Sequence, residues 1–255
     1  MKHRQIKRYG WVRDLPQIQD RVFSMPHAVL PDVVDLSAQC PPVYNQGQLG
    51  SCTANSVASA FDFERKAQGL SFITPSRLFL YYNTRDIEGT VDYDSGASLR
   101  DTIRSVVKQG VCPEIDWPYD ISKFTEQPPF DTYLTAEKNQ ALEYRRIAPS
   151  ETEMMQCLAL VKRPFVFGFS VFGFFETPEM ESTGILRLPD DSERSPIGGH
   201  AVKCVGYDRI KRLFKIKNSY GAAWGPFGGF FYIPFDYAAN PGLADDRWII
   251  TRVEN

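Results

Sequence analysis

Cys52 stands where a glycine-punctuated loop changes into a helical pattern. The run from Asn45 to Ser56 reads NQGQLGSCTANS, so the glycines precede the cysteine and the alanine-rich helical residues follow it. A helix N-terminus presents unpaired backbone N–H groups and about half a unit of positive charge. Both favour the thiolate and lower the pKa of a cysteine placed there. Cys52 is therefore a candidate nucleophile, and no other cysteine in the sequence has such surroundings.

The composition is ordinary for a soluble protein of one large domain or two lobes. The chain has 255 residues, of which 43% are hydrophobic and 24% charged, and its formal net charge is -2. This balance gives no sign of a nucleic-acid partner. No apolar span reaches transmembrane length, so we expect no membrane partner either.

The cysteine count and the N-terminus bear on the compartment. The basic residues 1–10 are not followed by an apolar core, so a cleavable secretory signal is not expected. The five cysteines are an odd number at irregular spacing, without a CxxC pair, at positions 40, 52, 112, 157 and 204. The sequence therefore predicts no zinc site, no metal and no organic cofactor. It favours the cytoplasm or another reducing compartment, although a disulfide from Cys40 stays open.

The hydrophobic pattern changes character near the middle of the chain. Capping and glycine signals predict helices over Cys52–Gln68, from Thr74, over Ser98–Gly110 and from Ser150. Short apolar or alternating runs then predict strands at Phe165–Phe172, His200–Tyr207, Leu213–Asn218, Gly229–Ile233 and Trp248–Val253. We expect an α+β protein with a helical lobe over residues 45–145 and a β lobe over residues 150–255. Residues 188–196, which are rich in acidic side chains, predict an exposed loop.

His200 is the best candidate for the base that would activate Cys52. The sequence has three histidines, and His3 and His27 lie in an N-terminal segment with little core character. His200 opens a predicted strand, where the backbone is fixed while the first side chain stays near the surface. Gly198 and Gly199 precede it and leave space for a substrate backbone.

Two further residues complete a candidate site for acyl transfer. Asn218 follows a predicted strand and can offer an amide oxygen that orients His200, with Tyr220 and Trp224 close behind to shield that hydrogen bond from water. Gln46, on the loop before Cys52, has an amide that can donate to the developing oxyanion, together with the Cys52 N–H. Taken singly, each residue is more often structural: a buried thiol, a core histidine, or a loop amide. The four residues together instead favour a catalytic site.

Gln46, Cys52, His200 and Asn218, in this order and with their neighbours, resemble the papain family of cysteine peptidases. The similar segments are LPDVVD at 30–35, QGQLGSC at 46–52, HAVKCVGY at 200–207 and NSYGAAWG at 218–225. His200 and Asn218 follow Cys52 by 148 and 166 residues, against about 130–150 for this type of site. The resemblance covers residue 30 to the C-terminus.

The resemblance implies a papain-like fold of two lobes, one helical and one an antiparallel β-barrel-like lobe, with the active-site cleft between them. It places Cys52 on the long helix of one lobe and His200 with Asn218 on the other. It also implies that an extended peptide binds along Ser95 and Gly96, with Ala97, Ser98 and Gly198 near a side-chain pocket. We count Gly199, Tyr220 and Trp224 with these substrate-binding residues.

The sequence departs from the family pattern at three positions. Leu49 stands where members usually have a disulfide-bonded cysteine, so that bridge must be absent. Thr53 replaces an aromatic residue after the nucleophile, and Tyr220 replaces a tryptophan after Asn218–Ser219. We expect these changes to reduce activity rather than to abolish it.

Residues 1–29 form an N-terminal extension before the peptidase domain of residues 30–255. This extension is shorter than the inhibitory prosegments common in the family, but Tyr9–Val12 and Leu15–Pro16 are apolar enough to pack onto the rest of the chain. We expect an intramolecular contact between residues 1–29 and the catalytic domain, covering part of the cleft.

The sequence thus predicts a cysteine peptidase, foremost an endopeptidase, whose partner is a peptide or protein substrate. Cys52 would attack a peptide carbonyl and His200 would protonate the leaving amine before water hydrolyses the thioester. Three alternatives stay open: an exopeptidase whose cleft is closed at one end by residues 188–196 or the N-terminal extension, an acyltransferase that uses an amine in place of water, and a catalytically silent peptide-binding protein.

Overall fold

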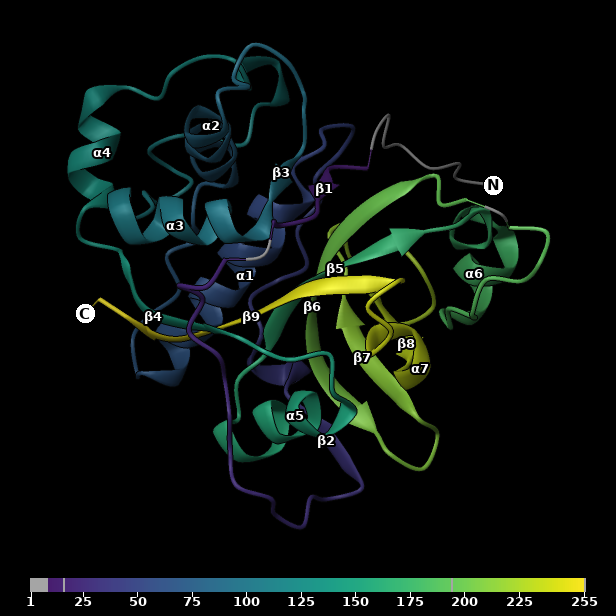
Figure 1. Ribbon diagram of the computed structural model, residues 1–255. Helices are drawn as coiled ribbons and strands as arrows, with labels where there is room; N and C mark the ends of the chain where they lie inside the picture. The colour runs from purple at the N-terminus through teal and green to yellow at the C-terminus, as the bar shows by residue number, and fades with distance from the viewer. Residues whose placement is uncertain (1–8, 16, 194, 255) are drawn as a thin grey trace.

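Helices gather on one side of the molecule and strands on the other. The structure is a computed structural model that describes residues 9–15, 17–193 and 195–254. In Figure 1, α2, α3 and α4 lie together on the left and the large sheet lies on the right, with α1 between them. His3 and the other residues of 1–8 lie outside the described residues. None of the described helices is both long and apolar enough to cross a membrane.

The helical side consists of α1 (Cys52–Ala67), α2 (Arg77–Glu88), α3 (Leu99–Gln109) and α4 (Phe130–Ala136). The capping signals in the sequence act as expected. The side chains of Ser76 and Ser98 accept hydrogen bonds from the N–H groups of Phe79 and Asp101, and α2 ends at Gly89 in the left-handed conformation. The predicted helices are therefore confirmed to within three residues.

The sheet side is antiparallel throughout. Its strands run in the order β4-β9-β5-β6-β7-β8, and β2 pairs with β6 outside this path. The bounds are β2 (Val33–Asp35), β4 (Ala141–Arg146), β5 (Phe165–Val171), β6 (Gly198–Asp208), β7 (Leu213–Lys217), β8 (Phe230–Pro234) and β9 (Ala244–Val253). The five strands expected from the sequence are all present. Strand β4 was not expected, because its sequence ALEYRR is polar and lies at the sheet edge.

Short elements complete the chain. Two-residue strands β1 (Trp11–Val12) and β3 (Ala97–Ser98) pair with each other in parallel. Helices α5 (Glu151–Gln156), α6 (Pro178–Thr183) and α7 (Phe235–Ala238) lie beside the sheet. A single π-helical turn covers Cys157–Val161, and 3₁₀ turns cover Ser37–Gln39, Ile121–Lys123 and Gly173–Glu176.

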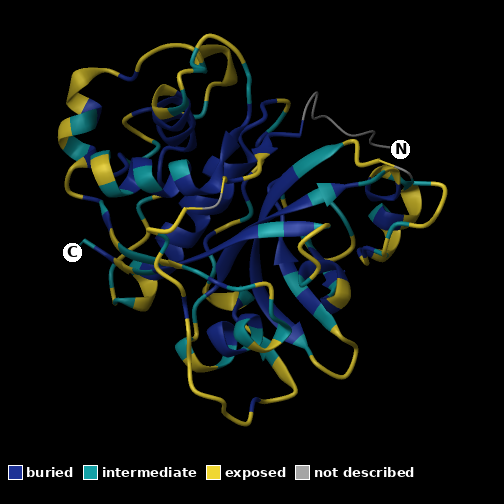
Figure 2. Ribbon diagram, in the orientation of Figure 1, coloured by how far each residue is buried: buried dark blue, intermediate teal, exposed yellow. Residues whose placement is uncertain are grey.

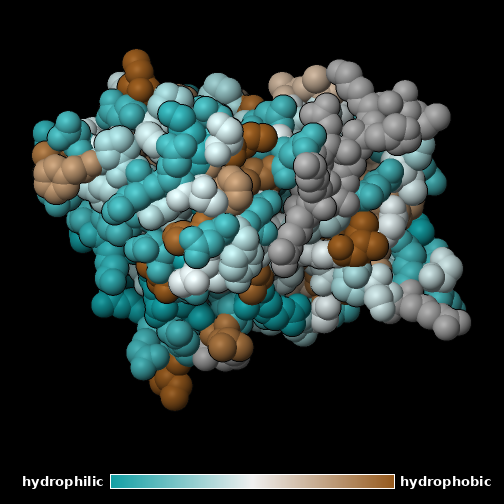
Figure 3. Space-filling view, turned by 90° about the horizontal axis from the view of Figure 1, so that it is seen from above, coloured by the Kyte–Doolittle hydropathy of each residue, from teal (hydrophilic) through white to brown (hydrophobic). Residues whose placement is uncertain are grey.

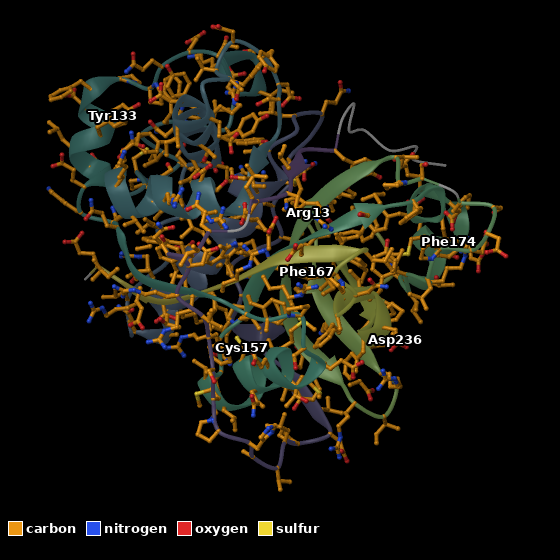
Figure 4. All side chains as sticks on the ribbon, viewed as in Figure 1. Arg13, Tyr133, Cys157, Phe167, Phe174 and Asp236 are labelled. Carbon is orange, nitrogen blue, oxygen red and sulfur yellow. The ribbon has the colours of Figure 1, made fainter. Side chains whose placement is uncertain are left out.

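Helix α1 is buried between the two sides. Every residue from Cys52 to Glu64 is buried, as the dark blue helix in Figure 2 shows. Side chains along β5 point alternately to the two faces of the sheet, so one face can pack against the helices. Val166 belongs to the core shared with the helices, whereas Phe165, Phe167 and Phe169 belong to the core on the other face of the sheet. Phe167 is labelled within this sheet in Figure 4. The strand predicted at Phe165–Phe172 is thus a strand of the core.

An ion pair ties the far end of α1 to the strand side of the fold. The carboxylate of Glu64 is almost completely buried and accepts from the guanidinium of Arg163, which precedes β5. Burial raises the pKa of Glu64, and the bond to Arg163 opposes that rise. A buried carboxylate without its cation costs considerably more than a broken surface pair.

Replacing Arg163 by Met is expected to lower the free energy of unfolding by about 3 kcal/mol, because Glu64 would be left buried and unpaired. Urea denaturation followed by circular dichroism measures this change. The double variant Glu64→Gln with Arg163→Met should recover part of the loss. Arg209→Met, which breaks an exposed pair with Asp32, is the control and should cost less than about 1 kcal/mol. Equal losses in the two single variants would contradict the assignment.

Candidate active site

Cys52 is the first residue of α1, as the loop-to-helix pattern predicts. Ser51 occupies the N-cap position, and the thiol is completely buried. The backbone N–H groups of Ala201 and Gly10 lie within hydrogen-bonding reach of its sulfur. Ala201 directly follows His200 on β6, so the packing of α1 on β6 places the thiol next to the backbone of the residue after the candidate base.

The pKa of the Cys52 thiol is raised to about 11 in this structure. Burial is the largest cause, and the N–H groups around the sulfur only partly offset it. The expectation of a lowered pKa rested on the helix N-terminus alone. That expectation is wrong for this structure. The removal of water around the sulfur raises the pKa by more than the helix N-terminus lowers it.

His200 and Asn218 form the predicted pair. The Nε2 atom of His200 lies 2.8 Å from Asn218 Oδ1, and both residues are buried. Asn218 Oδ1 also accepts from the Ser219 N–H at 2.8 Å, which fixes the orientation of the amide. The other ring nitrogen of His200, Nδ1, is then the atom that can exchange a proton with Cys52.

Aromatic rings enclose this pair. Tyr220 stacks on His200 with ring centroids 5.0 Å apart and planes at 30°, and Trp224 meets Tyr220 edge-on at 5.5 Å. Phe169 and Phe175 pack against other sides of the imidazole. Tyr220 therefore still covers the ring, although it stands where the family usually has tryptophan.

Gln46 lies beside the site but is held firmly by its neighbours. Its Nε2 donates to the Leu49 carbonyl at 3.0 Å, and its Oε1 accepts from Ser219 Oγ at 2.6 Å. These bonds join the loop before Cys52 to the segment after Asn218. One proton of the Gln46 amide is left for an oxyanion, so its role in catalysis stays a prediction. Leu49 packs in the helical core, and all five cysteines are free, so the family disulfide is absent as expected.

Residues 9–14, here called the arm, run across the catalytic residues. Strand β1 of the arm pairs in parallel with β3, and the Ala97 N–H donates to the Gly10 carbonyl at 2.7 Å. Gly10 passes so close to Gly50 that a Cβ added to Gly10 would lie 1.7 Å from the carbonyl oxygen of Gly50. The predicted contact of the N-terminal extension with the catalytic domain is therefore present for the described part of that extension.

The two large side chains beside Gly10 lie on either side of it against glycines of the sheet. Tyr9 packs on Gly198, and its hydroxyl donates to Glu176 at 2.7 Å. Trp11 packs on Gly168 and Gly199, where a Cβ would clash with the indole. The glycines expected to leave space for a substrate backbone instead leave space for the arm.

A pair of buried carboxylates holds the arm in place. Asp246 Oδ2, on β9, accepts from the indole N–H of Trp11 at 3.1 Å and from the backbone N–H of Asp14 at 2.8 Å. Asp14 in turn accepts from the indole N–H of Trp248 at 2.9 Å and from the Arg100 N–H. Arg146 donates to Asp246 Oδ1 at 2.9 Å. Arg13, labelled in Figure 4 where the helices meet the sheet, adds a bond to the Pro241 carbonyl.

Burial and mutual repulsion act on the protonation of the two carboxylates. The pKa of Asp246 is raised to about 7, chiefly by burial and next by the charge of Asp14, while Arg146 opposes the rise. Burial likewise raises the pKa of Asp14. Neither residue was predicted from the sequence. The available signal was the acidic pair at 245–246 shortly before the apolar run Trp248–Ile250, because carboxylates are rarely buried without a partner.

The structure gathers most of the predicted substrate-binding residues around the arm. Gly96, Ala97, Gly198 and Gly199 contact it directly, Ser98 pairs with Val12, and Tyr220 and Trp224 cover His200. Ser95 differs, because its hydroxyl bonds to Thr90 and to the Gly96 carbonyl of its own loop. Binding of substrate by these residues stays a prediction. Seen from above, the described surface is mainly hydrophilic with small separate apolar patches (Figure 3). No cluster of three metal-ligating side chains occurs within residues 9–15, 17–193 and 195–254.

Comparisons with known proteins point to one family. A family model for papain family cysteine proteases matches residues 30–249. An uncharacterised peptidase C1-like protein of Acanthamoeba polyphaga mimivirus is 36% identical over 97% of this chain and 88% of its own length. Mouse cathepsin K is 28% identical over 78% of this chain and 58% of its own length.

Solved structures show the same relationship. Xylellain, a cysteine protease from Xylella fastidiosa, superposes with a TM-score of 0.86 at 39% identity, covering 100% of this chain and 99% of its own. Procathepsin B from Trypanosoma congolense, at 20% identity and a TM-score of 0.72, covers 89% of this chain and 80% of its own and shares the fold. The family match spans Cys52, His200 and Asn218. The chain therefore belongs to the papain family of cysteine proteases.

Proposed function

We propose that this cysteine peptidase is an endopeptidase whose active site is kept closed by its own arm. Its activity as a thiol-dependent hydrolase follows from its family. The observation that carries the proposal is the arm itself, which passes Cys52 with Tyr9 on one side and Trp11 on the other. An extended chain can thus lie across the nucleophile in both directions, as an endopeptidase requires.

The residues fit the chemistry of peptide hydrolysis. With the cleft open to water, the Cys52 thiolate attacks the carbonyl carbon and forms a thioester, and the His200 imidazolium gives its proton to the leaving amine. Asn218 keeps Nδ1 of His200 directed at the sulfur. The Cys52 N–H and the Gln46 amide donate to the oxyanion of both tetrahedral intermediates. Water, deprotonated by His200, then releases the acid.

The arm is held in a way that resists its own cleavage. Gly10 turns its N–H toward the Cys52 sulfur, and its carbonyl oxygen is bonded to the Ala97 N–H. The thiol thus meets a hydrogen-bond donor in place of an electrophilic carbon. With the thiol also buried and its pKa raised, attack requires that the arm first leave the cleft.

Internal cleavage of peptides is the first expected outcome. A peptide library treated with the enzyme should show cuts distant from both ends, and Cys52→Ala should lower the rate by at least about 10³-fold. Mass spectrometry locates the cuts. An epoxide thiol reagent should label Cys52, and Cys40→Ala, which removes a partly exposed thiol, serves as the control with unchanged activity. Release of single residues or dipeptides alone would favour an exopeptidase.

Loss of the Trp11 side chain should open the cleft. Truncation of a buried tryptophan costs about 3 kcal/mol, so Trp11→Ala should raise the ratio of open to closed enzyme roughly 100-fold. The rate of Cys52 labelling should rise accordingly, because labelling needs access to the sulfur. Ile18→Ala, at a fully exposed position of the same extension, is the matched control. If Trp11→Ala and Ile18→Ala were labelled at equal rates with intact folds, the arm would not control access to Cys52.

Closure of the arm should weaken as the pH rises. In the closed state burial and Asp14 raise the pKa of Asp246 to about 7, and opening the arm removes both causes. The closed state therefore binds a proton that the open state gives up, so closure is strongest at acidic pH. It loses stability as the pH rises from the ordinary range near 4 through about 7.

Hydrogen exchange of the backbone measures this dependence without relying on catalysis. In Cys52→Ala protein, the exchange of residues 9–14, corrected for the intrinsic rate at each pH, should speed up between about pH 5 and 8. Asp246→Asn cannot titrate and should flatten the profile. A profile that is flat in the protein with Asp246 intact would refute the role of this carboxylate.

A further inference from the structure

A small cavity lies behind the catalytic asparagine, away from the arm. It has about 10 Å³ of room for the centre of a water-sized sphere, which is about the least that one small occupant such as a water needs. Its walls come from α1, from β6 after His200, and from the end of β7 into Ser219. The lining includes Tyr44, Ser59, Lys203, Lys217 and Asn218.

Two buried lysines meet at this cavity. Lys203 Nζ donates to the Ser59 carbonyl at 2.9 Å, and Lys217 Nζ donates to Ser59 Oγ at 3.2 Å and to the Pro42 carbonyl at 2.8 Å. Both side chains are almost completely buried. Among the described residues, neither forms an ion pair with a carboxylate. Two ammonium groups that share one serine and no counter-ion are costly to bury.

With both lysines protonated, the charges around them leave one positive charge in excess. Asp62 is the carboxylate that acts on both ammonium groups through its field. Arg77 also faces this region over the ring of Tyr44, but its charge is balanced by a bidentate pair with Glu114. Burial lowers the pKa of Lys217 well below its ordinary value, and the charge of Lys203 lowers it further, so Lys217 keeps its proton only when negative charge accompanies it. A monovalent anion would supply that charge.

Two more hydrogen-bond donors at the cavity lack an acceptor. Asn218 Nδ2 and the Tyr44 hydroxyl are both buried and have no hydrogen-bond partner within the described part of the chain. Asn218 cannot turn its amide to solve this, because its Oδ1 holds His200 and the Ser219 N–H. The ring centroid of Tyr44 lies 5.0 Å from Lys217 Nζ, and Tyr44 is more than nine-tenths buried. A site lined by donors and ammonium groups suits an acceptor that carries negative charge.

We propose that this cavity binds a single halide-sized anion, in the first place chloride. The anion accepts hydrogen bonds from Asn218 Nδ2 and the Tyr44 hydroxyl and neutralises the excess charge of Lys203 and Lys217. A water molecule fits the same volume but leaves that charge uncompensated. The site is separate from the thiol, because Asn218 stands between the anion and His200.

The anion would act on catalysis through Asn218. A hydrogen-bond partner for Asn218 Nδ2 fixes the amide nitrogen, while the amide oxygen of the same side chain orients His200. This consequence rests on the proposed peptidase function, whereas binding of the anion does not. Asn218 is here a residue through which the anion positions the imidazole, so chloride should change kcat more than KM.

Bromide crystallography tests binding directly. A crystal of the Cys52→Ala protein soaked in sodium bromide should show an anomalous peak in the cavity, within hydrogen-bonding distance of Asn218 Nδ2. The thermal midpoint in solution should be higher in sodium chloride or bromide than in sodium gluconate at equal ionic strength, because bound ligand stabilises the folded state. No peak in the cavity, together with no difference between the salts, would overturn the proposal in favour of a water.

Variants separate this site from general effects of salt. Tyr44→Phe removes one donor and should weaken halide binding roughly tenfold. Lys203→Met removes the excess charge and should abolish the difference between chloride and gluconate. Lys215→Met is the matched control, because Lys215 lies on β7 beside Lys217 but pairs with the exposed Asp35 outside the cavity. An identical halide response in Lys203→Met and Lys215→Met would contradict the site.

Activity gives an independent readout. With the arm opened by Trp11→Ala, kcat should be several-fold higher in chloride than in gluconate, and Tyr44→Phe should shift the chloride concentration needed to a roughly tenfold higher value. A bromide peak in an enzyme without peptidase activity would support the anion site and refute the proposed function. Peptidase activity with no peak and no halide response would do the reverse.

Discussion

The position of α1 between the helices and the sheet is the constraint on which the site depends. Its first nine residues, CTANSVASA, are small or short, so the helix can pack closely against β6 with every residue through Glu64 buried. This packing sets Cys52 next to the backbone of Ala201, which directly follows His200 on β6. A larger residue along this face would move the nucleophile away from its base. The buried pair of Glu64 and Arg163 fixes the other end of the same helix.

Two opposing effects act on the thiol at the start of this helix. The helix end and nearby N–H groups favour the thiolate, whereas loss of water favours the neutral thiol. In the closed structure the loss of water is larger, since the pKa of Cys52 is raised to about 11. Gly10 contributes to both, because its N–H faces the sulfur while the arm excludes solvent. Nucleophilicity is therefore controlled by access of water to the site as much as by the residues fixed around it.

Local signals explain what the sequence could predict. Serine caps and glycine ends located the helices, and alternation located five strands, because these patterns report on neighbouring residues. The order of Gln46, Cys52, His200 and Asn218 predicted the family. The polar edge strand β4 and the two-residue strands β1 and β3 gave no such signal, since their pairing depends on segments distant in the chain. The same reason hid the contact between Asp14 and Asp246, which lie 232 residues apart.

The glycines of the cleft leave space that both the arm and a substrate need. Gly96, Gly198 and Gly199 leave room for a backbone or a large side chain, and in the closed state the arm takes that room. A substrate that needs the same space cannot bind beside the arm, so binding of one requires release of the other. Substitution of any of these glycines would weaken arm and substrate together and could not separate the two. Asp246 can separate them, because its bonds to Trp11 and Asp14 belong to the arm, while the bond between His200 and Asn218 does not involve it.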